Sequence, residues 1–315
     1  SFLGGKPSTL EEFDASTYYE RYATSLRLGD IGYTNSKEKG IGIKANYDSL
    51  SAYTDSLTRA IETPSPLWQE IGVKLDGEYR QLNANILQIE NEYYSTVRPK
   101  QLLDGLEKPV LALKRRGVRY VELRSIDVNA FHPLGVSERQ LDFLEAFMLF
   151  CLLLDSPPID VQEQREIDQN LGGVAHRGRD PALFLLCQGR EIHLKDWARD
   201  LLNAMQPVCE ALDAGASGQP FSAALKHQLS IVEDPELTPS AQMLQEMRDT
   251  GEGFFHFAQR LSRQHHEYYL GLRLDAEREE FFRREAALSR QLQTQIEASD
   301  KIGFDQFLAE YFAQL

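Results

Sequence analysis

The chain has few cysteines, and their placement excludes two kinds of site. Only Cys151, Cys187 and Cys209 occur in 315 residues, and no two of them form a CxxC pair. Such wide spacing argues against a disulfide framework and against a cysteine zinc site. It indicates buried thiols in a reducing compartment, so we expect a cytoplasmic protein.

Long apolar runs and an excess of basic charge are also missing. The longest apolar stretch, residues 147–154, is too short to cross a bilayer, so no membrane partner is expected. There are 34 basic and 48 acidic residues, which give a net charge of −14. Nucleic acid is therefore not expected as a main partner, because binding its phosphates requires a basic surface.

The stretch around which the other candidate site residues are interpreted is residues 118–128, which read VRYVELRSIDV. Apolar and β-branched residues alternate with polar ones, which is typical of a strand, and we interpret it as buried. Successive side chains point to opposite faces, so Val121 and Leu123 should face the core while Glu122 and Arg124 share the other face. Two charges inside an apolar strand each require a partner.

A second stretch, residues 85–94, is predicted to form a neighbouring strand with Glu90 and Glu92 on one face. If both strands lie in one sheet, these carboxylates join Glu122 and Arg124. Crowded carboxylates repel one another and favour a cation, for which Mg²⁺ is a natural candidate because it prefers oxygen ligands. Arg124 would then suit a phosphate or a carboxylate. On the pattern alone, an exposed face with ordinary ion pairs is the more common arrangement.

Three stretches in this order resemble the bacterial glutamate–cysteine ligases (γ-glutamylcysteine synthetases). They are YATSLRLGDIGYTN at 22–35, QIENEYYSTVRPK at 88–100 and YVELRSIDVNAFHPLGV at 120–136. The resemblance extends along the whole chain, more weakly after about residue 190. Chains of that family carry a large N-terminal region before the segment that matches Ser1. The resemblance therefore implies a C-terminal portion of a longer protein, which by itself is expected to be inactive.

The resemblance also implies an activity. Such enzymes use ATP to join the side-chain carboxylate of glutamate to the amine of cysteine through an acyl phosphate, the first step of glutathione biosynthesis. Glutamate, cysteine and ATP are the implied small-molecule partners, and Mg²⁺ is the implied cofactor. Glu122 is implied as a metal ligand, with Glu90 and Glu92 as further candidates. Arg124 is implied as the catalytic contact to the transferred phosphoryl group.

Four residues are candidates for binding the substrates. The resemblance associates Arg27 with a substrate carboxylate, and Tyr33 and Tyr94 with the cysteine pocket. Without it, Arg27 is simply a surface ion pair and Tyr33 a core aromatic. Arg98, with Lys100, is a cation beside the carboxylate face and could contact anionic substrate or be solvated. Two alternatives stay open: a non-catalytic helical interaction module, and a carboxylate–amine ligase with another amino-acid acceptor.

The expected fold is α+β and rich in helix. The resemblance implies part of a curved antiparallel sheet of the glutamine-synthetase type, flanked by many helices. Residues 1–135 are expected to form the sheet-containing catalytic portion and residues 136–315 a mainly helical portion packed against it, in a monomer. Apolar spacing predicts a helix over 46–62 and a surface helix covering a core over 274–292, and Ser137-x-x-Gln140 predicts a capping box.

Overall fold

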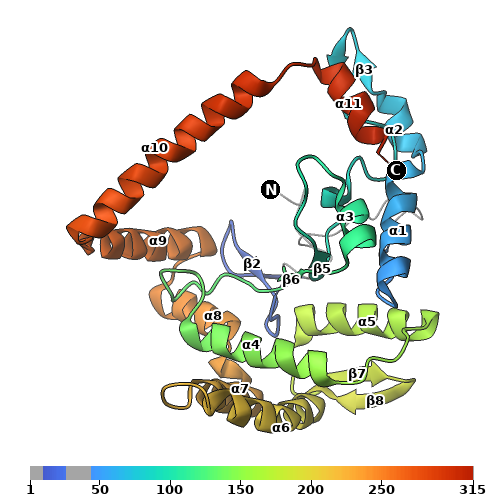
Figure 1. Ribbon diagram of the computed structural model, residues 1–315. Coiled ribbons are helices and arrows are strands. Elements are labelled where there is room, and N and C mark those ends of the chain that lie inside the picture. Colours follow the sequence, from blue (N-terminus) through green and yellow to red (C-terminus); the bar gives the residue numbers. More distant parts are fainter. Residues whose placement is uncertain (1–9, 26–43, 315) are drawn as a thin grey trace. The chain divides into compact units, whose positions relative to one another are not determined.

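The computed structural model describes residues 10–25 and 44–314 (Figure 1). The chain forms two compact units, here named unit 1 (1–34 and 125–265) and unit 2 (35–124 and 266–315). Each unit combines two chain segments, so these boundaries differ from the single division after residue 135. Which residues form the catalytic portion stays a prediction.

Unit 1 is mainly helical. Its elements are β1 (Glu11–Glu12), β2 (Tyr18–Tyr19), α4 (Glu138–Leu153), α5 (Val161–Arg177), β7 (Phe184–Cys187), β8 (Arg190–His193), α6 (Leu194–Asp213), α7 (Pro220–Glu233), the 3₁₀ helix η2 (Pro235–Leu237), α8 (Pro239–Thr250) and most of α9 (Phe254–Gly271). Helix α4 begins at the predicted capping box, in which the side chains of Ser137 and Gln140 each accept the other's backbone N–H. That prediction is confirmed.

The largest core cluster of unit 1 lies where α4, α6 and α7 pack together. Its most buried members are Ala146, Met205 and Cys209, and removing their apolar surface from water stabilises the packing. Only part of α4 is covered in this way, because one helix face contacts its neighbours. Cys151 and Leu152, on other faces, are exposed. The expectation that the thiols are buried is therefore wrong for Cys151.

Unit 2 contains the two paired strands that carry the candidate site, residues 97–100 and 120–123. Its elements are α1 (Leu50–Glu62), α2 (Pro66–Ile71), β3 (Lys74–Leu75), β4 (Glu78–Tyr79), the 3₁₀ helix η1 (Glu90–Glu92), β5 (Val97–Lys100), α3 (Pro109–Arg116), β6 (Tyr120–Leu123), α10 (Ala276–Ser299) and α11 (Phe304–Phe312). Helix α1 confirms the helix predicted over 46–62; Ser49 caps it by accepting the N–H of Ala52, and Pro64 follows its last turn.

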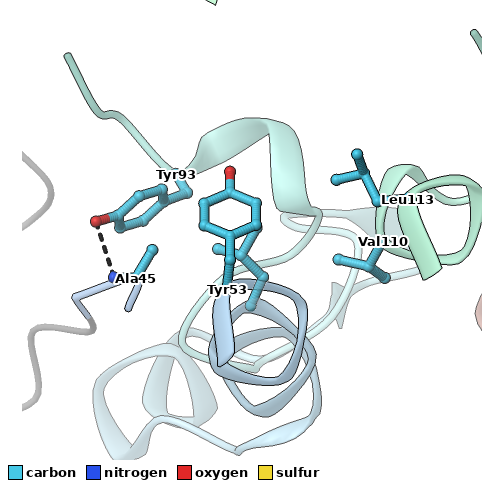
Figure 2. Packing of buried hydrophobic residues seen from close by; sticks show 6 residues of the cluster. Ala45, Tyr53, Tyr93, Val110 and Leu113 are labelled. Carbon is cyan, nitrogen blue, oxygen red and sulfur yellow. Dashed lines mark hydrogen bonds between the residues drawn. The ribbon is translucent and has the colours of Figure 1, made fainter. Parts of the chain in front are cut away.

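The core of unit 2 lies between α1, α3 and η1 (Figure 2). Tyr53 projects from α1, and Val110 and Leu113 project from α3. Tyr93, which directly follows η1, accepts the backbone N–H of Ala45 on its hydroxyl oxygen at 2.9 Å. This packing positions the chain just before β5, and therefore also positions β5 itself.

Every sheet in the described part of the chain is a pair of antiparallel strands: β1–β2, β3–β4, β5–β6 and β7–β8. The helix-rich α+β class is confirmed, whereas the curved, larger sheet stays a prediction. None of the described helices combines the length and apolar character needed to cross a membrane.

Helix α10 differs from its predicted role. It has no buried residue, and Phe281, Leu288 and Leu292 are 46%, 45% and 47% exposed. The helix is real, but within the described residues it covers no core. Its apolar spacing predicted the helix correctly and the burial incorrectly, because periodicity alone does not supply a packing partner.

Candidate functional site

The candidate site lies on the strand pair β5–β6 of unit 2. The two strands are antiparallel, with Arg98 opposite Glu122 and Lys100 opposite Tyr120. The N–H of Arg124 donates to the carbonyl of Thr96 at 2.8 Å, which continues the pairing by one residue. Side chains directly opposite one another share a face. One face therefore carries Arg98, Lys100, Tyr120, Glu122 and Arg124.

The opposite face of β6 is less buried than expected. Val121 is 42% exposed and Leu123 is half-buried. The prediction that Val121 lies in the core is wrong, because a pair of strands with no further neighbour among the described residues has little to pack against.

The predicted strand over 85–94 is also wrong, because this segment turns and forms η1 instead. The side chain of Gln88 accepts the N–H of Leu82 at 2.6 Å, and Glu92 accepts the N–H of Gln88 at 2.7 Å. Such local bonds between side chain and backbone compete with strand pairing. The neighbour of β6 is β5, which begins at Val97.

Glu122 is held between two cations. Arg124 donates Nε–H to its Oε1 at 2.9 Å, and the Nζ of Lys100 lies 3.3 Å from its Oε2. The hydrogen bond from Arg124 lowers the pKa of Glu122 below 4.5, assisted by Lys100 and opposed by partial burial. The expectation that Glu122 and Arg124 share one face and need charged partners is confirmed. They provide part of each other's charge compensation.

Arg98 lies deeper than a solvated cation would. It is 4% exposed, and its Nη2 donates to the backbone carbonyl of Glu90 at 3.0 Å. Among the described residues, no carboxylate lies within ion-pair distance of it. Tyr53 is close enough that Arg98 lowers its pKa, although burial has the larger effect and raises it. Sequence reasoning missed this aromatic surrounding, since only the fold brings α1 to β5.

The other two predicted carboxylates have different surroundings. Glu90 is 1% exposed, and neither of its carboxylate oxygens makes a hydrogen bond within the described residues. Burial raises the pKa of Glu90, while nearby backbone N–H groups and the charge of Lys108 oppose the rise. Glu92 is exposed and bonded to Gln88. Across residues 10–25 and 44–314, no three His, Cys, Asp or Glu side chains gather as a metal site.

The remaining predicted residues concern substrate binding. Tyr94 is half-buried, two residues beyond η1. Arg27 and Tyr33 lie outside the described residues. Their roles, and that of Tyr94, stay predictions.

Comparison with known proteins agrees with the three sequence stretches. Residues 1–174 match the family described as "Glutamate-cysteine ligase". The chain belongs to this family. Among curated members, the glutamate–cysteine ligases of Pseudomonas paraeruginosa and Azotobacter vinelandii are 45% and 43% identical over 314 and 315 residues. Each alignment covers 100% of this chain and 59% of the relative, so the chain spans about three-fifths of their length.

A solved structure agrees with the family assignment. Glutamate–cysteine ligase from Francisella tularensis, solved in complex with AMP, has a TM-score of 0.88 and 33% identity. The match covers 98% of this chain and 60% of that one. A bifunctional glutathione synthetase from Pasteurella multocida has a TM-score of 0.56 and 21% identity, over 80% of this chain and 27% of that one, and shares the fold alone.

Proposed function

We propose that the natural protein containing this chain uses ATP to join the side-chain carboxylate of glutamate to the amine of cysteine through an acyl phosphate. Membership of the glutamate–cysteine ligase family carries this proposal. The AMP held by the Francisella tularensis relative supports the use of a nucleotide. In the present chain, the shared face of β5 and β6 is the proposed place of phosphoryl chemistry.

The charge balance of that face supports the placement. Three cations, Arg98, Lys100 and Arg124, lie on the face with one carboxylate, Glu122. The excess positive charge suits phosphate oxygens, and fixed donors stabilise the charge that develops during phosphoryl transfer.

We assign the contact with the transferred phosphoryl group to Arg124. Its Nε is occupied by Glu122, but its two Nη atoms have no acceptor among residues 10–25 and 44–314. The side chain is 32% exposed, so these donors are accessible while the bond to Glu122 sets the plane of the guanidinium. Arg98, buried on the same face, is the proposed contact for an anionic substrate group.

Glu122 suits one position in a Mg²⁺ coordination shell. Its Oε2 is buried and has no hydrogen-bond donor within the described residues, and a cation already lies 3.3 Å away. Mg²⁺, when bound, would neutralise phosphate charge and act as a Lewis acid. Glu90 and Glu92 stay candidate ligands on the resemblance alone, because η1 does not place them on the strand face.

Other features of the whole protein are also proposals, and they too rest on membership of the family. We propose that β5–β6 belongs to a larger curved antiparallel sheet and that the protein is a cytoplasmic monomer. Arg27, Tyr33 and Tyr94 are proposed to bind substrate, with the two tyrosines at the cysteine pocket.

The test is ADP release by the purified natural protein, measured with glutamate, cysteine or Mg²⁺ omitted in turn. We expect release that requires glutamate and Mg²⁺, with γ-glutamylcysteine identified by mass spectrometry. Release independent of glutamate would contradict the assignment. Full turnover with another amine in place of cysteine would favour a ligase with a different acceptor. Absence of any ADP release would favour a non-catalytic module.

A further inference from the structure

The position of Lys100 adds a residue to the proposed reaction. Its Nζ reaches diagonally across the strand pair, from a position opposite Tyr120 to Oε2 of Glu122. Diagonal neighbours in an antiparallel pair lie within reach of long side chains. The side chain of Lys100 is 24% exposed and that of Glu122 34%, so the ion pair is only partly shielded from water.

The two cations on Glu122 are held differently. Arg124 makes a directed hydrogen bond to Oε1. Lys100 lies within 3.3 Å of Oε2, yet this oxygen has no partner in hydrogen-bond geometry among the described residues. The Lys100 contact is therefore the longer and less directed of the two. An ammonium on a flexible four-carbon chain can leave such a contact more easily than a planar guanidinium bonded through Nε.

We propose that Lys100 is an exchangeable counter-cation of Glu122. It neutralises Oε2 while no divalent cation is bound, and it turns to a phosphate oxygen of the nucleotide or acyl phosphate when Oε2 takes a divalent cation. This inference rests on the proposed function. It makes Lys100 both a competitor of the metal ion and a contact for the phosphate.

These two roles predict opposite effects of Lys100→Met. Without the competing ammonium, the protein alone should bind Mn²⁺ more tightly, by roughly fivefold, which is the upper end for a partly exposed ion pair. Without the phosphate contact, the KM for ATP should rise by about tenfold, near the lower end of the range for one hydrogen bond to a charged group. A merely structural lysine would weaken both kinds of binding or leave both unchanged.

The experiment measures Mn²⁺ binding to the natural protein by the loss of the free-ion paramagnetic resonance signal, without nucleotide. Lys100→Gln serves as a second neutral variant if Lys100→Met folds poorly, and Lys100→Arg, which keeps the charge, should bind Mn²⁺ as the unmodified protein does. Lys74→Met is the matched control, because Lys74 also pairs with one carboxylate, Asp305, at 2.7 Å in unit 2. It should change neither quantity.

Each outcome decides the proposal. Tighter Mn²⁺ binding by the neutral variants supports the exchange. Unchanged or weaker binding, or no Mn²⁺ binding by any form, overturns it. The Mn²⁺ measurement needs no turnover, so it stays decisive if ADP release shows that the proposed ligase activity is wrong. The KM for ATP then separates a competitor of the metal from a residue that also contacts phosphate.

Discussion

The substitution Lys108→Met tests how the C-terminal segment is held in unit 2. Lys108 directly precedes α3 and is 7% exposed. Its Nζ donates to the backbone carbonyls of Phe312 and Gln314, both at 3.1 Å. Its backbone N–H donates to the side chain of Gln314 at 2.9 Å. One lysine thus binds carbonyls at the end of α11.

The expected loss follows from these bonds. A hydrogen bond from a charged donor contributes about 1.5–3 kcal/mol. A cation at a helix C-terminus contributes roughly 0.3–1 kcal/mol more. Methionine fills a similar volume and supplies neither. The freed carbonyls can partly rehydrate, so we expect a loss near the lower end of the sum for two such bonds. The free energy of local opening over residues 304–314 should therefore fall by about 3 kcal/mol.

Hydrogen exchange of α11 peptides, followed by mass spectrometry, measures this opening. A loss of about 3 kcal/mol corresponds to roughly hundredfold faster exchange. Lys114→Met is the control: its Nζ lies 3.0 Å from Asp55, but it is 40% exposed, so less than about 1 kcal/mol is at stake. Unchanged exchange of α11 in Lys108→Met, or equal acceleration in both variants, would refute the reasoning.

Further predictions concern the site and its support. Glu122→Gln in the natural protein should lower turnover and Mg²⁺ dependence together, whereas a purely structural pair with Arg124 predicts a lower melting temperature and normal turnover. Arg124→Lys should lower turnover more than it raises the KM for cysteine, because lysine lacks the planar, forked donors of the guanidinium. Equal fold-changes in turnover and in the KM for cysteine would argue against a phosphoryl contact. Tyr93→Phe should cost about 1–3 kcal/mol of unfolding free energy in urea titrations, because the buried N–H of Ala45 loses its acceptor; an unchanged midpoint would contradict this. Burial raises the pKa of Glu90, so its protonated form favours folding below about pH 4.5, and this contribution is lost as the pH rises through the folded-state pKa. Melting temperatures of Glu90→Gln and the unmodified chain, compared from pH 4 to 8, should therefore diverge as the pH rises, with the variant more stable at high pH; parallel curves would show that Glu90 titrates normally.

Much of the local structure could be predicted from the sequence, because it depends on neighbours in the chain. The capping box at Ser137 and Gln140 is built from residues three apart, and helix α1 ends where Pro64 prevents its continuation. The alternation that places Glu122 and Arg124 on one face follows from the geometry of any extended strand. The family resemblance likewise rests on contiguous stretches of sequence.

The strand partner of β6 was decided only by tertiary structure. The segment around Glu90 has a pattern compatible with a strand, yet local hydrogen bonds and packing against α1 and α3 make it a 3₁₀ turn. Val97–Lys100 then pairs with β6 and brings Arg98 and Lys100 to Glu122. Alternation fixes which way a side chain points, but not which strand lies beside it, because pairing depends on contacts between residues distant in the chain.

Burial of side chains was likewise decided by tertiary structure, even where the sequence predicted the element correctly. The apolar spacing of α10 and the alternation at Val121 predicted the correct elements, while Phe281 and Val121 are exposed among the described residues. Conversely, nothing in the sequence around Glu90, Arg98 or Lys108 marks these charged residues as buried. Periodicity is a property of the chain itself, whereas burial is a property of the surfaces that meet, and only the folded arrangement determines those.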